Sequence, residues 1–201
     1  MSLDSHSPGP EIVLEALLTS TAVVALAEIG DKTQLLAILL ATRFKRPVPI
    51  IAGILAATLA NHFLAAFVGA QAAAILDGQW FRYLIAASFI AMAMWTLIPD
   101  TIDDIEDKPA RFGAFVTTLV AFFLVEMGDK TQIATVALAA QFHSLVLVVL
   151  GTTVGMLLAN VPVVFAGDAL MRYVPLRVVR SVAALSFAAL GIYVLVFARA
   201  A

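Results

Sequence analysis

Apolar residues form six long runs along this chain, and the runs fall into two groups of three. They cover residues 12–42, 48–70 and 82–99, and then 112–142, 144–166 and 181–198. About 20 apolar residues cross the roughly 30 Å of a bilayer's hydrocarbon core, and several runs reach or pass that length. The composition agrees, with 62% apolar residues, 13% charged residues and a mean hydropathy of +1.01. The pattern predicts an all-α integral membrane protein with six transmembrane helices.

The two groups of runs match each other at a fixed spacing of 98 residues. The segment 28–34, Glu-Ile-Gly-Asp-Lys-Thr-Gln, returns at 126–132 as Glu-Met-Gly-Asp-Lys-Thr-Gln. Identities at the same spacing continue beyond the motif, as at Gly53 and Gly151. An internal duplication is therefore expected. Its parts are a first three-helix repeat over 1–99 with a disordered tail at 1–11, an acidic cytoplasmic linker over 100–111, and a second three-helix repeat over 112–201.

Lysine and arginine in the short loops indicate the orientation of the six helices. Eight of them fall in or beside loops one, three and five, and two fall on the other side: Arg43, Lys45, Arg46, Lys108, Arg111, Arg172, Arg177 and Arg180 against Arg82 and Arg199. Because cytoplasmic loops carry the excess of positive charge, both termini are predicted outside. Three helices per repeat is an odd number, so the second repeat enters the membrane from the opposite face. This predicts two inverted repeats, with a transport site near the midplane where they meet.

Charged residues occur inside the two motif runs, where they are expensive. A charge at the centre of a membrane helix costs roughly 2.5–3.5 kcal/mol unless it pairs or binds something. Each motif run has 31 residues, about 46 Å as an unbroken helix, which exceeds the hydrocarbon thickness. The runs must therefore tilt, kink or break, and Gly30 and Gly128 are the expected positions. Freed backbone groups there are tolerated only where they line a polar cavity.

The motif side chains suit a hard divalent cation. Four carboxylates, with two hydroxyls and two amides, would make an oxygen-rich pocket: Glu28, Asp31, Glu126 and Asp129, then Thr33, Thr131, Gln34 and Gln132. Ca²⁺ takes six to eight oxygens, and Mn²⁺ accepts carboxylate, carbonyl and water. The chain has no Cys, which removes thiolate sites. With Lys32 and Lys130 the formal charge is −2, which one divalent ion would neutralise; without the ion, a low dielectric favours protonated carboxylates.

Other interpretations of these residues remain open. The motif charges could be structural ion pairs, Glu28 with Lys32 and Glu126 with Lys130. Asn61 and Asn160, on the second helix of each half, could line the transport path or form interhelical hydrogen bonds. A cation channel and an exporter of a small cationic amino acid are alternative functions. An enzyme is not expected, because no nucleophile and base pair or asymmetric acid and base pair is present.

The duplicated motif also carries a family resemblance. Glu-x-Gly-Asp-Lys-Thr, twice in a six-helix chain with an acidic cytosolic loop, resembles the family of cation/proton exchangers that includes bacterial manganese exporters of the MneA type and the eukaryotic Golgi manganese and calcium transporter. The resemblance covers nearly the whole chain, and it extends to the lysine-exporter superfamily of inverted three-helix repeats.

The resemblance implies an antiporter of metal homeostasis in the bacterial inner membrane, with Mn²⁺ or Ca²⁺ as transported substrate and no cofactor. It implies that the four carboxylates bind cation and protons, that the Thr and Gln residues support them, and that the two lysines tune the charge. The hypothesis that follows is alternating access: a divalent cation enters from the cytosol, displaces protons, and leaves outside as protons return. Neither heptad departs from the family pattern.

Overall fold

A computed structural model describes residues 10–76, 78–98, 113–167 and 175–197, and these ranges contain helices and no strand. The first half holds α1 (Pro10–Glu28), α2 (Lys32–Phe44), α3 (Pro47–Ile75) and α4 (Gly78–Thr96). The second half holds α5 (Ala114–Glu126), α6 (Lys130–Phe142), α7 (Leu145–Ala166) and α9 (Leu176–Val196). The prediction of an all-α chain is confirmed for this part of the protein.

Four of the helices are long and apolar enough to cross a membrane. These are α1, α3, α7 and α9, while α5 is apolar but shorter. Large apolar side chains also cover the outside of the bundle. Leu84, Leu158 and Leu185, for example, are 60%, 59% and 69% exposed. Such a surface is costly in water and favourable in lipid. The chain is a multi-pass membrane protein.

Both motif runs are broken where the sequence predicts it. Helix α1 ends at Glu28 and α2 begins at Lys32, and α5 and α6 repeat this at Glu126 and Lys130. The glycine in each break has a positive φ, +80° at Gly30 and +81° at Gly128, which other residues rarely adopt. The helix therefore stops, turns and starts again, because only glycine takes this conformation without strain.

Some predicted boundaries need correction. The tail was predicted disordered over 1–11, but Pro10 and Glu11 form the first turn of α1. Proline suits the first turn because its missing N–H has no helical partner there, and an acidic residue is favourable near a helix N-terminus. Helix α4 begins four residues before the predicted run and α9 five residues before it. The linker 100–111 lies outside the described residues.

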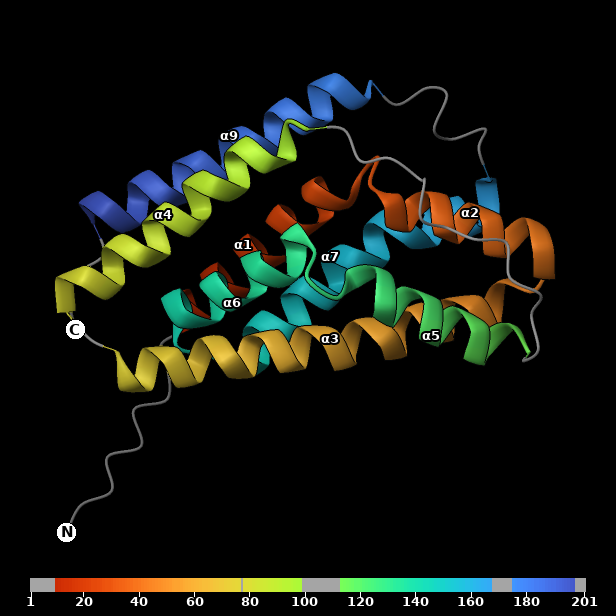
Figure 1. Cartoon of the computed structure of the whole chain (residues 1–201), viewed down its shortest axis with the longest axis horizontal. Coiled ribbons are helices and arrows are strands. Elements are labelled where there is room, and N and C mark those ends of the chain that lie inside the picture. The colour runs from red at the N-terminus through yellow and green to blue at the C-terminus, as the bar shows by residue number, and fades with distance from the viewer. Residues whose placement is uncertain (1–9, 77, 99–112, 168–174, 198–201) are drawn as a thin grey trace, which may run out of the picture.

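The helices run back and forth along one long bundle (Figure 1). Helix α1 begins and α9 ends at one end of the bundle, while α2 ends and α5 begins at the other. Helices α4 and α9 lie side by side along one flank, next to α1 and α6. Helix α3 packs against α5, α6 and α7, and α7 packs along α1. This arrangement brings the break between α1 and α2 toward the break between α5 and α6 inside the bundle.

Small residues allow the helices to approach closely around the two breaks. A Cβ atom on Gly69 of α3 would lie 2.2 Å from the carbonyl oxygen of Val136 in α6. One on Gly155 of α7 would lie 2.6 Å from the carbonyl oxygen of Thr21 in α1. Backbone contact of this kind is common where membrane helices associate. The position of α6, and so of the second motif, depends on the close crossing of α3 and α6 at Gly69.

Candidate cation site

Each break presents two carboxylates at a helix end. Glu28 and Glu126 are the last residues of α1 and α5, and Asp31 and Asp129 precede the first residues of α2 and α6 with extended backbones. Neither aspartate caps its own helix through its side chain. Their carboxylates are therefore available for other partners, while the positive end of the helix dipole remains close by.

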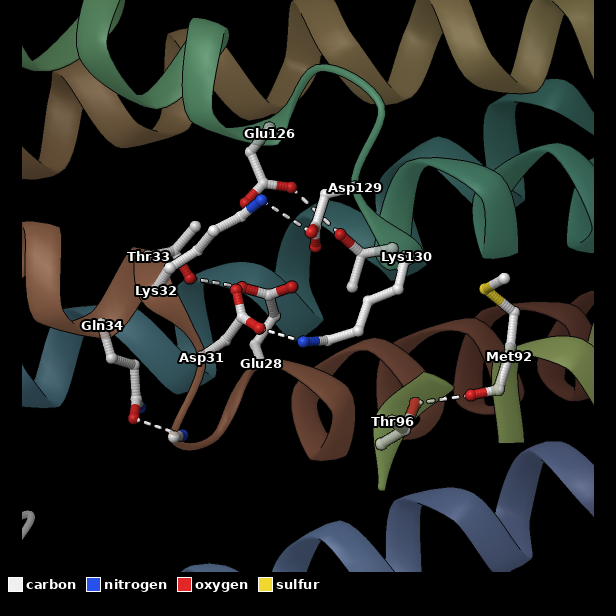
Figure 2. A network of polar contacts seen from close by, with 12 residues as sticks. Glu28, Asp31, Lys32, Thr33, Gln34, Met92, Thr96, Glu126, Asp129 and Lys130 are labelled. Carbon is white, nitrogen blue, oxygen red and sulfur yellow. Dashed lines mark hydrogen bonds and ion pairs between the residues drawn. The ribbon is translucent and has the colours of Figure 1, made fainter. Parts of the chain in front are cut away.

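All four predicted carboxylates come together in the structure. One carboxylate oxygen from each of Glu28, Asp31, Glu126 and Asp129 lies within 4.8 Å of the other three, and all four residues are buried. Figure 2 shows them between the two breaks, with each break supplying one pair. Oxygens at this spacing, drawn from two separate segments, could all reach a single cation.

The two lysines pair across the halves, and not with the glutamates of their own motifs as the alternative of structural ion pairs would have it. Lys130 contacts Asp31 of the first copy, and Lys32 Nζ lies 2.8 Å from Asp129 Oδ1 of the second. Figure 2 shows the two side chains reaching in opposite directions between the breaks. The reason is the break itself, because the interruption at Gly30 puts Glu28 and Lys32 on different helices. The aspartates thus have the cationic partners that pairing within a motif would deny them.

The threonines bind the glutamates. Thr33 Oγ1 donates to Glu28 Oε2 at 2.5 Å, and Thr131 Oγ1 donates to Glu126 Oε2 at 3.0 Å. Each hydroxyl lies on the first turn of the helix that follows the break. It therefore fixes a carboxylate from the helix that precedes the break, and the predicted supporting role has a defined contact in both copies.

The glutamines stabilise the breaks and do not contact the carboxylates. Gly30 N donates to Gln34 Oε1 at 2.7 Å, and Gly128 N donates to Gln132 Oε1 at 2.7 Å. The amide nitrogens reach other helices, Gln34 to the carbonyl oxygen of Ala159 at 2.6 Å and Gln132 to Asn61 Oδ1 at 3.4 Å. A backbone N–H left free by a broken membrane helix needs such a partner.

The two predicted asparagines are both buried but differ in their contacts. Asn61 Nδ2 donates to the carbonyl oxygen of Phe123 in α5 at 2.9 Å, which is the expected interhelical hydrogen bond. Asn160 Nδ2 donates to Met156 O within its own helix at 3.1 Å. Neither asparagine is bonded to the four carboxylates among the described residues.

The two breaks differ in their surroundings, which the sequence repeat did not indicate. A Cβ atom on Gly30 would lie 2.6 Å from Leu176 Cδ2 of α9, whereas none of the described residues comes within 4 Å of one on Gly128. The lysines also differ, but in the opposite sense, since the Lys130 side chain of the uncovered break is 3% exposed and the Lys32 side chain of the break under Leu176 is 28% exposed. Leu176 is the residue that sequence analysis missed, because an apolar residue outside both motifs carries no signal of its own.

Comparison with known proteins shows the family to which this chain belongs. The family described as "Divalent cation/proton antiporter GDT1" matches residues 16–104 and 114–201. The "Putative manganese exporter" of Vibrio cholerae serotype O1 is 51% identical over 175 residues, 87% of each chain. "GDT1-like protein 5" of Arabidopsis thaliana is 28% identical over 218 residues, 90% of this chain and 95% of its own. No solved structure matches.

The family match spans both halves and leaves out only residues 1–15 and 105–113. It is a family of transporters and not a class of enzymes, as the sequence led us to expect. The prediction from the duplicated motif is confirmed, and the chain belongs to the GDT1 family of divalent cation/proton antiporters.

Proposed function

We propose that this protein exports divalent cations, Mn²⁺ first and Ca²⁺ as the second candidate, from the cytoplasm in exchange for protons. One observation carries the proposal, the convergence of four buried carboxylate oxygens within 4.8 Å from two separate helix breaks. The ligands would be Glu28, Asp31, Glu126 and Asp129. The same groups would carry the cation in one direction and protons in the other.

The charge at the site supports a divalent ion. Four carboxylates and the two paired ammonium groups leave a formal charge of −2. Buried charge of this size is unfavourable unless a cation or protons neutralise it. One divalent ion or two protons would neutralise this charge equally. An exchange cycle of one divalent ion for two protons would therefore keep the site neutral in both states.

The ligand chemistry and one relative support manganese. The site offers carboxylate oxygens held by hydroxyls, and the chain has no Cys for softer metals. The similar protein of Vibrio cholerae is named for manganese export. Calcium prefers the same type of ligand, so the choice between the ions rests on measurement.

The transport cycle we propose is alternating access between two inverted repeats. Residues 1–99 and 112–201 would each form three spans, with the motif run broken in the middle and both termini outside. In support, the breaks recur at the same spacing as the sequence repeat. Figure 1 also shows that α1 and α2 run one way along the bundle, α3 the other way and α4 back again. Sites of this kind, between broken helices of two repeats, occur in many secondary transporters.

The test is transport by the purified protein in proteoliposomes that contain a pH dye. Mn²⁺ or Ca²⁺ is added outside, and metal uptake and internal pH are recorded for the wild type, Glu28→Gln and Glu126→Gln. These variants keep both ion pairs and nearly the same side-chain volume. Exposed Glu15, far along α1 from the break, gives the matched control Glu15→Gln. We expect metal movement with opposite proton flow in the wild type and the control, and its loss in both site variants.

The alternatives predict other results. A cation channel would pass metal without any proton movement. An exporter of a small cationic amino acid would be inhibited by lysine more than by manganese. Transport that survives neutralisation of each of the four carboxylates in turn would overturn the site.

A further inference from the structure

We propose that Lys32 is a tethered cation that occupies the site when no metal is bound and that the entering metal ion displaces from Asp129. Lys130 does not move in this step and stays paired with Asp31. The inference rests on the proposed function and assigns the two lysines of the repeated motif different roles, although their sequence context is nearly the same.

The Lys32 ammonium contacts only one of the carboxylate oxygens near it. Its ammonium lies 2.8 Å from Asp129 Oδ1, while Asp129 Oδ2 and the nearby Glu126 Oε1 are buried with no hydrogen-bond partner among the described residues. Buried oxygens without partners are costly. A divalent ion that reached them would satisfy oxygens that the ammonium cannot, and would bring twice the charge.

The two lysines differ in how easily each ammonium could leave its ion pair. The Lys130 side chain is 3% exposed and contacts Asp31 inside the bundle, whereas the Lys32 side chain is 28% exposed. A lysine can move its charged end toward water while its methylene chain stays in apolar surroundings. Displacing Lys32 therefore costs little desolvation energy, whereas displacing Lys130 would leave an ammonium in the interior without its partner.

Lys32 pairs with Asp129, which follows the break at Gly128, and this break is exposed. Met127 is 54% exposed and Gly128 is exposed, and both lie in irregular backbone between two apolar helices. Irregular backbone cannot face lipid inside a membrane, so it must border water or other protein. Since nothing among the described residues covers it, we infer an aqueous opening at residues 127–128. The opposite break is closed by Leu176 over Gly30.

These features give Lys32 a function in the cycle. An empty site with four carboxylates would resist any motion that carries it through a low dielectric. The tethered ammonium neutralises part of that charge, and it leaves toward the opening when metal arrives from the same side. The lysine would thus weaken metal binding and permit release, so removal of its charge should tighten binding and slow turnover.

Metal binding to the purified full-length protein tests this. Mn²⁺ is titrated calorimetrically into the wild type, Lys32→Met and Lys32→Arg, with thermal unfolding as the check on folding. We expect Lys32→Met to bind Mn²⁺ about tenfold more tightly, because the competing charge is gone, and to transport it more slowly. Lys32→Arg keeps the competing charge and should not bind more tightly than the wild type.

Displacement itself is measured by acylation of lysine amines with an NHS ester, followed by peptide mass spectrometry. Added Mn²⁺ should accelerate the reaction at Lys32 in the wild type, since the amine leaves its ion pair. Lys45, at the far end of α2, is the internal control and should not change. Protection of Lys32 by Mn²⁺, or equal or weaker Mn²⁺ binding by Lys32→Met, overturns the proposal.

Failure of the proposed function would look different. In that case the wild type would bind no Mn²⁺ at all, and its transport would show no dependence on the four carboxylates. Mn²⁺ binding by the wild type that is lost in Glu126→Gln, combined with unchanged affinity in Lys32→Met, would refute only the role of Lys32.

Discussion

Leu176 in the first turn of α9 lies directly over Gly30, so that a Cβ atom on this glycine would be 2.6 Å from Leu176 Cδ2. The residue 98 positions before Leu176 is Gly78, which begins α4 and has no side chain to cover anything. At the matching break, no described residue lies within 4 Å of a Cβ atom on Gly128. Two nearly identical motifs therefore have different surroundings because helices outside the motifs differ.

Alanine at the two break glycines separates backbone strain from the contact with Leu176. Both positions have φ near +80°, so Gly30→Ala and Gly128→Ala should each lose about 1–2 kcal/mol of stability from the left-handed backbone. Only Gly30→Ala also pushes against Leu176. We expect it to unfold at a lower temperature than Gly128→Ala, as measured by thermal unfolding in detergent.

A double-mutant cycle checks the cause of that difference. In a Leu176→Ala background the additional loss for Gly30→Ala should shrink, because the side chain that it meets is gone. Equal unfolding temperatures for the two single alanine variants would contradict the close contact.

Thiol labelling tests which break is open, and the chain suits it because it contains no Cys. Ile29 and Met127 are equivalent positions of the two motifs, half-buried and 54% exposed respectively. A charged, membrane-impermeant thiol reagent reacts only in water, so it should label Met127→Cys several times faster than Ile29→Cys. Adding Leu176→Ala should raise the rate at Ile29→Cys and leave that at Met127→Cys unchanged.

The labelling result is compared with denatured protein, in which both cysteines should react alike. Fast reaction at Ile29→Cys in the folded protein, or no effect of Leu176→Ala, would show that Leu176 does not close this side.

The breaks and the grouping of carboxylates were predictable because they follow from local features. A repeated motif, a run too long for the bilayer, and a glycine at its centre can all be read from the sequence. The crossed ion pairs were not predictable in this way. The pairing of Lys32 with Asp129 depends on how the two breaks face each other, and that is set by packing between segments far apart in the chain.

The different surroundings of the two motifs could not be predicted from the sequence for another reason. Nearly identical motifs predict nearly identical environments, whereas the Lys32 side chain is 28% exposed and the Lys130 side chain 3%, and Leu176 of α9 lies over Gly30 alone among the two break glycines. The glutamines were likewise assigned to the site by composition. Their amides instead accept hydrogen bonds from Gly30 N and Gly128 N. The freed backbone groups were expected from the sequence, but it did not show that the glutamines would bind them.

Close packing of α3 on α6 should be essential for the position of the second motif. Gly69→Ala would place a Cβ atom 2.2 Å from the carbonyl oxygen of Val136 and 2.9 Å from its carbonyl carbon. Backbone in a helix cannot rotate away, so α6 must shift, at a cost of about 1–3 kcal/mol. We expect lower thermal stability and reduced metal transport.

Gly113→Ala is the comparison for this variant. Gly113 precedes α5, has an ordinary φ of −65°, and a Cβ atom there would meet no described residue within 4 Å. It should lose at most about 1 kcal/mol, since only the helix cap changes. Equal effects of the two alanines would mean that the crossing of α3 and α6 is less close than the structure has it.

The hydrogen bond from Thr33 to Glu28 should hold that carboxylate in place for the cation. Thr33 Oγ1 lies 2.5 Å from Glu28 Oε2, and Glu28 Oε1 has no hydrogen-bond partner among the described residues. Thr33→Val keeps the shape of the side chain and removes its hydroxyl. Both oxygens of the buried Glu28 carboxylate would then lack a hydrogen-bond donor. A hydrogen bond to a charged group contributes about 1.5–3 kcal/mol, so Mn²⁺ affinity should fall roughly tenfold or more.

Thr33→Ser is the matched control, because it keeps the hydroxyl and loses a methyl group. Calorimetric titration of Mn²⁺ should give a serine variant close to the wild type and a valine variant that binds weakly but unfolds at a similar temperature. Thr131→Val should have a smaller effect, because its hydrogen bond to Glu126 is longer, at 3.0 Å. If serine and valine weaken binding equally, the lost methyl packing is responsible, and Thr33 does not position Glu28 through its hydroxyl.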